Sequence, residues 1–410
     1  MPNYCLLDFP FSPLTQNDGI VEIDETYKGR EHSLIKHELL KGYLETLLSI
    51  IGVMGQAAEI VYVDCFAGPW GDESEALSGT SIAISLNILS KVRDRLIRAH
   101  KRTGITFKAI YVEESKGRYK RLSEYLQKHC PDGIQCHALH GDYSALQDEI
   151  LRLCGDRSFA FFFIDPKGWR DVGVEKLSKL LHRPKSEFLI TFMYDFFNRA
   201  IGMADFRQQV HKMLGTLTEK EHQQISLLTG KERGEMVVRM YRGQLKVAMG
   251  PDGKRPSRSY HANILNKEKD RTHYHMVYLT RHYKGIVKFA ESSEKVDLLQ
   301  RVVRIQKRQN AASQTGLFTA EEEAEHQTDA RVGLDEVKSY WLEQLTSTPR
   351  KFDEARLADM LEATGWLIRD FQSALAELIA QGKVKNLDAV AKRSKRPLHF
   401  EKGERLGRCL

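Results

Sequence analysis

The sequence lacks the features that define several protein classes. None of its six cysteines (5, 65, 130, 136, 154 and 409) forms a Cys-x-x-Cys pair, which excludes a zinc site or redox pair of that type. No apolar run reaches the roughly 18 residues of a membrane span. Residues 1–14 carry no Lys or Arg before their apolar residues, unlike a secretory signal. We therefore expect free thiols, a cytoplasmic protein and no membrane partner.

The composition is that of a folded protein of two or three domains. The chain has 410 residues, of which 41% are hydrophobic and 29% charged, so a packed core is feasible. The net charge is +7, which is too mild to identify a partner. Its distribution is more informative, because Lys383 to Arg408 holds nine basic and three acidic residues, a net charge of +6.

The first 300 residues alternate between helical and strand patterns. Apolar residues recur at helical spacing between residues 35 and 51, and a short apolar strand follows at Glu59–Asp64. Further runs of strand length lie at residues 107–112, 136–139, 160–164 and 188–193. Strands separated by helices predict right-handed βαβ units in a mostly parallel, Rossmann-like α/β sheet. Residues 260–265 and 274–280 predict an antiparallel hairpin at the sheet edge.

The last third of the chain changes character. Residues 306–333 are polar and contain three consecutive glutamates, which is typical of a linker. Three helices are expected after it, followed by a basic hairpin, the order of a winged-helix domain. The predicted division is therefore a Rossmann-like domain over residues 1–300, a linker over 301–333, and a separate basic winged-helix-like domain over 334–410.

Acidic residues follow four predicted strands. Asp64, Glu113, Asp142 and Asp165 each stand where a strand ends, and a small-residue turn, Phe66-Ala67-Gly68-Pro69-Trp70-Gly71, follows the first. One such acid is typical of a cap or turn, but four in succession indicate a ligand site, because open α/β sheets bind ligands at these ends. The turn lacks the third glycine of Gly-x-Gly-x-x-Gly, which disfavours a nicotinamide oxidoreductase.

This constellation resembles the class I S-adenosylmethionine-dependent methyltransferases and, more closely, the three-Cys-motif partner protein family. The resemblance covers roughly residues 33–290. It rests on Lys36-His37, the segment from Tyr62 to Pro69, Val112-Glu113, Gly141-Asp142, the segment from Phe162 to Pro166, and Tyr278 to His282. The chain is also similar to ribosomal RNA adenine-N6 methyltransferases, which share the Lys-His helix and the glycine turn.

The resemblance implies roles for individual residues. Six would bind S-adenosylmethionine: Asp64, Phe66, Gly68, Gly71, Glu113 and Asp142. Asp165 and Pro166 would form the catalytic motif, since an acceptor that bonds an amine hydrogen aims the nitrogen lone pair at the methyl group. Trp169 is the candidate for stacking on a target base, or else a core residue. Lys167 departs from the family, which usually has Phe at that position.

Two functions remain open from the sequence. One is a methyltransferase acting on DNA or RNA; the other is a non-catalytic nucleic-acid-binding or assembly partner of a three-cysteine-motif protein. In either case Lys392, Arg393, Lys395 and Arg396 are expected to contact phosphates. His273 and His275 would share one face of a strand, but no third metal ligand is identifiable, so a solvated face is expected and no metal site is predicted.

Overall fold

The structure is a computed structural model of the chain. It describes residues 31–55, 57–68, 77, 79–215, 217–266, 271–311, 332–346, 348–391, 393 and 396–409. Within these ranges no helix combines the length and the apolar character needed to cross a membrane.

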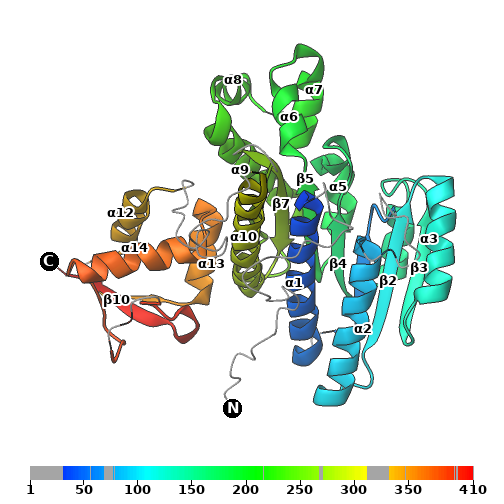
Figure 1. Cartoon of the computed structure of the whole chain (residues 1–410), viewed down its shortest axis with the longest axis horizontal. Helices are drawn as coiled ribbons and strands as arrows, with labels where there is room; N and C mark the ends of the chain where they lie inside the picture. Colours follow the sequence, from blue (N-terminus) through cyan, green and yellow to red (C-terminus); the bar gives the residue numbers. More distant parts are fainter. Residues whose placement is uncertain are drawn as a thin grey trace.

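A seven-stranded sheet forms the centre of the molecule (Figure 1). Its strands are β1 (Glu59–Asp64), β2 (Thr106–Glu113), β3 (Ile134–His140), β4 (Phe159–Ile164), β5 (Ser186–Phe192), β6 (Arg258–Leu265) and β7 (Thr272–Thr280). They lie in the order β3-β2-β1-β4-β5-β7-β6, with β1–β5 parallel and β7 antiparallel to both neighbours. The Rossmann-like sheet and the edge hairpin predicted from the sequence are confirmed.

Helices cover both faces of this sheet. One face packs against α1 (Glu31–Met54), α2 (Ser81–His100), α3 (Lys116–His129) and α10 (Tyr283–Ala311). The other packs against α4 (Gln147–Cys154), α5 (Val174–Leu181) and α9 (Gly230–Met249). The short helices α6 (Tyr194–Ile201), α7 (Arg207–Leu214) and α8 (Glu219–Leu227) follow β5 and lie at the top of Figure 1. Strand residues alternate between the two cores, as the period of two requires.

A buried glutamate ties α1 to the sheet. Oε2 of Glu187 on β5 accepts hydrogen bonds from the hydroxyls of Tyr43 on α1 (3.0 Å) and Tyr278 on β7 (2.6 Å). Its Oε1 accepts one from Thr280 (2.8 Å). Burial raises the pKa of Glu187 although these three bonds oppose the shift. These hydrogen bonds fix the middle of α1, where Tyr43 lies, against β5 and β7.

The C-terminal residues form a second, smaller unit. It consists of α12 (Leu334–Gln344), β8 (Arg350–Phe352), α13 (Glu354–Thr364), α14 (Ile368–Ala380), β9 (Val384–Asn386) and β10 (Glu404–Arg408). Its three strands lie in the order β8-β10-β9. The three expected helices are present, and β8 between the first two was not predicted. Residues 301–311 of the expected linker belong to α10, so the linker does not begin at residue 301; residues 312–331 lie outside the described part.

The C-terminal unit is docked on the larger one, with α13 beside α10 in Figure 1. Oε1 of Glu362 on α13 accepts the backbone N–H of Ser259 (2.8 Å), and its Oε2 accepts Arg258 (2.8 Å), both on β6. Arg369 on α14 forms an ion pair with the buried Asp297 on α10. Polar side chains and a continuous apolar core therefore join the two parts, which the sequence did not predict.

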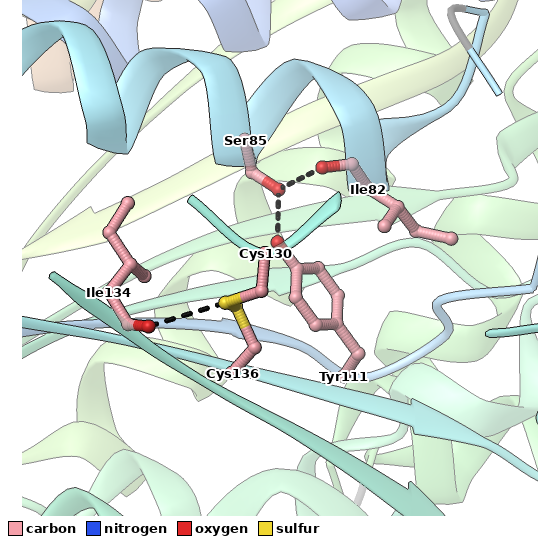
Figure 2. The surroundings of a disulfide bond; sticks show 6 residues. All are labelled: Ile82, Ser85, Tyr111, Cys130, Ile134 and Cys136. Carbon is pink, nitrogen blue, oxygen red and sulfur yellow. Dashed lines mark hydrogen bonds between the residues drawn. A yellow bond between two sulfur atoms is a disulfide. The ribbon is translucent and has the colours of Figure 1, made fainter. Parts of the chain in front are cut away.

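Two cysteines are joined, contrary to the expectation of free thiols. Cys130, just after α3, and Cys136 on β3 form a disulfide with a Cα–Cα distance of 6.2 Å. Figure 2 shows the bond beside Ile134, with the hydroxyls of Ser85 and Tyr111 paired nearby (2.8 Å). A separation of six residues does not by itself predict a disulfide. Cys65, Cys154 and Cys409 are free, and Cys5 lies outside the described residues.

The docking contact yields a test. Replacing Glu362 with Ala leaves the half-buried Arg258 and the Ser259 amide without their shared acceptor. We expect the free energy of unfolding, measured by urea denaturation, to fall by about 2–4 kcal/mol. Asp359→Ala is the matched control. Asp359 also pairs with Arg258 (2.7 Å) but is 64% exposed, so its loss should cost less than about 1 kcal/mol. Equal losses in the two variants would contradict this account of docking.

Candidate functional site

The carboxyl ends of β1, β2 and β4 meet at one edge of the sheet. Asp64, Glu113 and Asp165 stand at or just after these ends. Because β1 lies between β2 and β4, the three acids belong to adjacent strands. Three of the four acids that the sequence places at strand ends therefore lie together at one edge of the sheet.

Asp64 is the most deeply buried of these acids, with no exposed surface. Its Oδ1 accepts the backbone N–H of Phe66 (3.0 Å), and its Oδ2 accepts the hydroxyl of Ser81 at the start of α2 (2.6 Å). Burial raises the pKa of Asp64 to about 7, with the charge of Asp165 adding to the increase and Lys36 opposing it. Near neutral pH an approaching cation would therefore favour the ionised form of this carboxyl, with its proton released to solvent.

Asp165 is held by a lysine that lies 129 residues earlier in the chain. Lys36 on α1 forms an ion pair with Oδ2 of Asp165, and the two side chains are 15% and 19% exposed. Oδ1 of Asp165 accepts no hydrogen bond from the described residues. Pro166, which follows, is buried. One carboxylate oxygen is thus fixed while the other remains available at the sheet edge.

Glu113 is almost fully buried at the end of β2. Its Oε1 accepts the backbone N–H of Ser115 (2.6 Å) and Nε of Arg118 (2.9 Å), both at the start of α3. Oε2 accepts no bond from any described residue, so it can take a ligand hydroxyl. Lys167, after β4, lies close enough that its pKa is lowered by partial burial and by Arg118, against the opposing charge of Glu113.

The turn after β1 is fixed to both neighbouring strands. The backbone N–H of Ala67 donates to the carbonyl of Val112 on β2 (2.8 Å), and that of Cys65 donates to Phe163 on β4 (3.0 Å). Gly68 is buried immediately beyond. The turn is therefore rigidly placed between the strands that carry Glu113 and Asp165. Gly71, the other expected cofactor glycine, lies outside the described residues.

Two further candidates occupy the neighbouring positions. The Phe66 ring contacts the ring of Tyr143 (4.9 Å between centroids). The two rings therefore border the carboxyl edge of the sheet next to β3. Asp142 follows β3 but is exposed, and its carboxylate caps the local turn by accepting the N–H (2.8 Å) and hydroxyl (2.9 Å) of Ser144. Asp142 thus lies beside the acids without joining their buried group.

Trp169 has a different environment from the one predicted for base stacking. It is 8% exposed and packs edge-on against Phe197 of α6, with 5.2 Å between centroids. This placement favours the core role, which the sequence left as the alternative.

Sequence reasoning missed a polar group beyond β5. Asp195, in the first turn of α6, forms an ion pair with Arg271 (3.0 Å) and lies 3.6 Å from Nδ1 of His273. The signal that could have identified Asp195 is the one used for the other acids, since it follows the end of β5. The expected solvated face is wrong for His275, which is 3% exposed, bonds Asn263 (2.7 Å), and has its pKa lowered to about 3 by burial and by Arg242.

The predicted phosphate contacts in the tail are only partly described. Arg393 binds both carboxylate oxygens of the buried Glu404 (2.8 and 2.9 Å), and Arg396 lies 3.7 Å from Glu401. Lys392 and Lys395 lie outside the described residues. Other basic side chains of this unit are exposed and form no hydrogen bond or ion pair with a described residue: Lys351, Lys383, Lys385, Lys402 and Arg408. We call these five the unpaired basic residues; the strand register puts Lys351 and Lys385 on one side of the small sheet and Arg408 on the other.

Comparisons with known proteins yield distant structural similarities. No protein-family model matches the sequence, and no curated protein does. Protein LPL1258 from Legionella pneumophila is 10% identical with a TM-score of 0.36, over 65% of this chain and 91% of that one. PKMT2 from Rickettsia typhi is 10% identical with a TM-score of 0.28, over 61% and 56%. The SAH-bound methyltransferase PaMTH1 from Podospora anserina is 9% identical with a TM-score of 0.25, over 63% and 97%.

The sheet itself has the predicted architecture. It is mostly parallel, with β7 reversed between β5 and β6 to form an antiparallel edge hairpin. It places Asp64, Glu113 and Asp165 at the edge where open α/β sheets bind ligands.

The raised pKa of Asp64 predicts a pH-dependent stability. A carboxyl whose pKa is higher in the folded protein stabilises the fold fully below its unfolded pKa near 4, and this contribution is lost as the pH rises through about 7. Asp64→Asn removes the titration. From pH 5 to pH 8, the unfolding free energy of the variant should therefore gain roughly 2–3 kcal/mol relative to the parent chain.

Urea denaturation at both pH values measures this difference. Asp142→Asn is the control, since Asp142 is exposed and should leave the pH profile unchanged. If the unfolding free energies of Asp64→Asn and the parent chain change equally between pH 5 and pH 8, Asp64 is not the source of the pH dependence.

Proposed function

We propose that this protein binds S-adenosylmethionine at the carboxyl edge of its sheet and methylates a nucleic acid. The observation that carries the proposal is the arrangement of three acids on adjacent strands: a buried, partly protonated Asp64, a buried Glu113 with an open oxygen, and an Asp165 oriented by Lys36. Membership of the three-Cys-motif partner family stays a prediction.

The residues present fit this cofactor. Oε2 of Glu113 is available for a ribose hydroxyl, which a carboxylate at the end of the second strand can bind. The carboxyl of Asp64 would ionise beside a cationic amino group, since an opposite charge favours the charged form. Gly68, without a side chain, leaves the turn backbone open to close approach. Asp142 would reach the adenine from the exposed side of the same edge.

S-adenosylmethionine supplies an electrophilic methyl group when bound. The free Oδ1 of Asp165 would accept a hydrogen bond from the target amine and so orient the nitrogen lone pair. Lys36 pairs with Oδ2 of Asp165 and so fixes its rotamer, which limits the carboxylate to one working oxygen. Pro166 holds the preceding backbone extended, so that Asp165 faces the edge.

A second candidate function has an observation of its own. The burial of Trp169 against Phe197 leaves no aromatic residue of this motif to stack on a flipped base. This favours the alternative in which the methyltransferase-like fold serves as a non-catalytic partner of a three-cysteine-motif protein. A transfer assay separates the two functions, because only the first one requires turnover.

The C-terminal unit is proposed to be a winged helix that binds phosphates. The order helix, strand, two helices and two strands supports this, as does the exposure of the unpaired basic residues. In helix-turn-helix proteins the last helix reads the major groove. Here α14 has one basic residue, Arg369, which is bound to Asp297. Phosphate contacts are therefore assigned to the unpaired basic residues.

Two substitutions test the cofactor assignment. One should weaken cofactor binding, and the other should abolish methyl transfer while leaving cofactor binding nearly unchanged. Glu113→Gln should weaken S-adenosylmethionine binding by at least about tenfold in calorimetry, because charge-assisted bonds to ribose hydroxyls are lost. Asp165→Asn should keep the affinity within about threefold but abolish transfer of labelled methyl groups to mixed DNA and RNA.

Glu114→Gln, at the exposed neighbour of Glu113, is the control and should leave affinity unchanged. If the parent chain fails to bind the cofactor, the proposed function is wrong. If it binds the cofactor but transfers nothing, the non-catalytic alternative stands.

The salt dependence of nucleic-acid binding tests the role of the unpaired basic residues. Replacing Lys351, Lys385, Lys402 and Arg408 with Ser should flatten the log–log salt slope for duplex binding by about 3.6, since each neutralised phosphate contributes about 0.9. Affinity should fall for unrelated sequences alike.

The matched control replaces four lysines outside the C-terminal unit, Lys91, Lys101, Lys120 and Lys179, with Ser. An equal change of slope in the control would mean that net charge matters rather than this surface.

A further inference from the structure

A cavity of about 370 Å³ opens at the opposite edge of the sheet, where the parallel strands begin. It is lined by the first residues of β4 and β5, the end of β7, the start of α10 and the second half of α1. The proposed cofactor site lies at the other ends of the same strands. The two sites therefore share the sheet and α1 but none of the residues discussed above for the cofactor.

One wall of the cavity is aliphatic. Leu47, Ile50, Ile51 and Met54 of α1 line it, and Phe159 at the start of β4 extends it. Met54 is 56% exposed, so this wall reaches from the buried core to the surface. A ligand body placed here would gain free energy by leaving water against an apolar surface.

Cations surround the remainder of the cavity. Lys185, Arg255 and Lys284 line it, and none of the three forms an ion pair or hydrogen bond through its side chain with a described residue. The pKa of His282, which also lines it, is lowered by burial and by the charges of Arg255 and Lys284. The cavity therefore carries an uncompensated positive potential, which favours an anion.

The acids of the cavity do not neutralise these cations. Glu187 is fully occupied by Tyr43, Tyr278 and Thr280, and burial raises its pKa. Asp252 is bridged to Arg255 through the backbone but forms no side-chain ion pair with a described residue. Its charge acts on the buried Arg281, where it partly offsets the lowering of the guanidinium pKa by burial.

Two backbone features shape the charged end. Lys185 adopts a left-handed conformation (φ +49°), in which glycine would be less strained. The strain places a lysine at the mouth of the cavity, and strained residues cluster at functional sites. A Cβ at Gly285 would lie 2.4 Å from the Tyr278 hydroxyl, so only glycine lets the first turn of α10 pack this closely against the end of β7. The N-terminal turn of a helix carries a partial positive charge, which adds to that of the cations.

We propose that this cavity binds an amphipathic anion, with a phosphate or carboxylate held by Lys185, Arg255 and Lys284 and an aliphatic body lying against α1. Its size falls within the range of small-molecule sites, which combine an apolar lining with few polar groups. The inference does not depend on the proposed methyltransferase function.

Calorimetry on the full chain with four probes tests this site. Octyl phosphate and octanoate carry both features, 1-octanol lacks the anion, and inorganic phosphate lacks the aliphatic body. At least one of the two amphiphiles should bind at a single site, about tenfold or more tighter than either control probe. A preference for octyl phosphate identifies a phosphate ligand, and a preference for octanoate identifies a carboxylate; either result supports the site.

Two variants locate the binding. Lys185→Gly removes one cation while keeping a residue that accepts the left-handed backbone, so the fold should persist and amphiphile affinity should fall about tenfold. Ile50→Trp should abolish binding by filling the cavity from α1. Lys101→Gly is the matched control: Lys101 is also left-handed (φ +54°) but does not line the cavity.

The proposal is overturned if neither amphiphile binds, or if Lys185→Gly and Ile50→Trp bind like the parent chain. S-adenosylmethionine affinity should be the same in all three variants, so failure of this site is distinguishable from failure of the cofactor site.

Discussion

The position of α1 across the sheet is the constraint on which both proposed sites depend. Its midpoint is fixed by the hydroxyl of Tyr43, which donates to the buried Glu187 beside Tyr278. Toward one end Lys36 reaches Asp165 at the carboxyl edge, and toward the other Ile50 lines the cavity at the amino edge. A helix anchored at its middle can present one end to each edge. Loss of the central contact would therefore disturb both sites together.

Burial of acidic groups gives the structure its electrostatic character. Asp64 and Glu187 both have raised pKa values because desolvation disfavours their charged forms. Their partners differ, however. Glu187 is saturated by three hydroxyl groups, so it is a structural element, whereas Asp64 accepts one amide and one hydroxyl. A buried acid with remaining acceptor capacity at a strand end is suited to receive a cationic ligand.

Much of the fold was predictable from local patterns. Apolar runs located β1, β2, β4 and β5, because buried parallel strands are nearly continuous in hydrophobicity. The partly buried β3 was located by the Gly141-Asp142 turn that follows it, and β6 and β7 by two successive β-rich runs. The acids Asp64, Glu113 and Asp165 were found because they follow those strands. The ion pair between Lys36 and Asp165 was not, since 129 residues separate its members and only the tertiary structure brings them together. Trp169 shows the converse limit: its sequence position does not reveal whether the ring faces the core or the edge.

The docking of the C-terminal unit was not predictable for a related reason. A polar segment marks a connection but does not reveal what packs across it. Glu362 accepts bonds from β6, and Arg369 reaches Asp297 on α10, contacts between segments distant in sequence. These contacts occupy the only basic residue of α14. As a result, the exposed positive charge of the unit lies on its strands and hairpin, including Lys351 on β8, which charge counting in the tail alone overlooked.

A crystal structure of the full chain grown with S-adenosylhomocysteine tests the central claim most directly. The account predicts the nucleoside across the ends of β1 and β2, with a ribose hydroxyl within hydrogen-bond distance of Oε2 of Glu113 and the amino group near Asp64. An empty edge at saturating ligand, or the ligand bound elsewhere on the molecule, would contradict it.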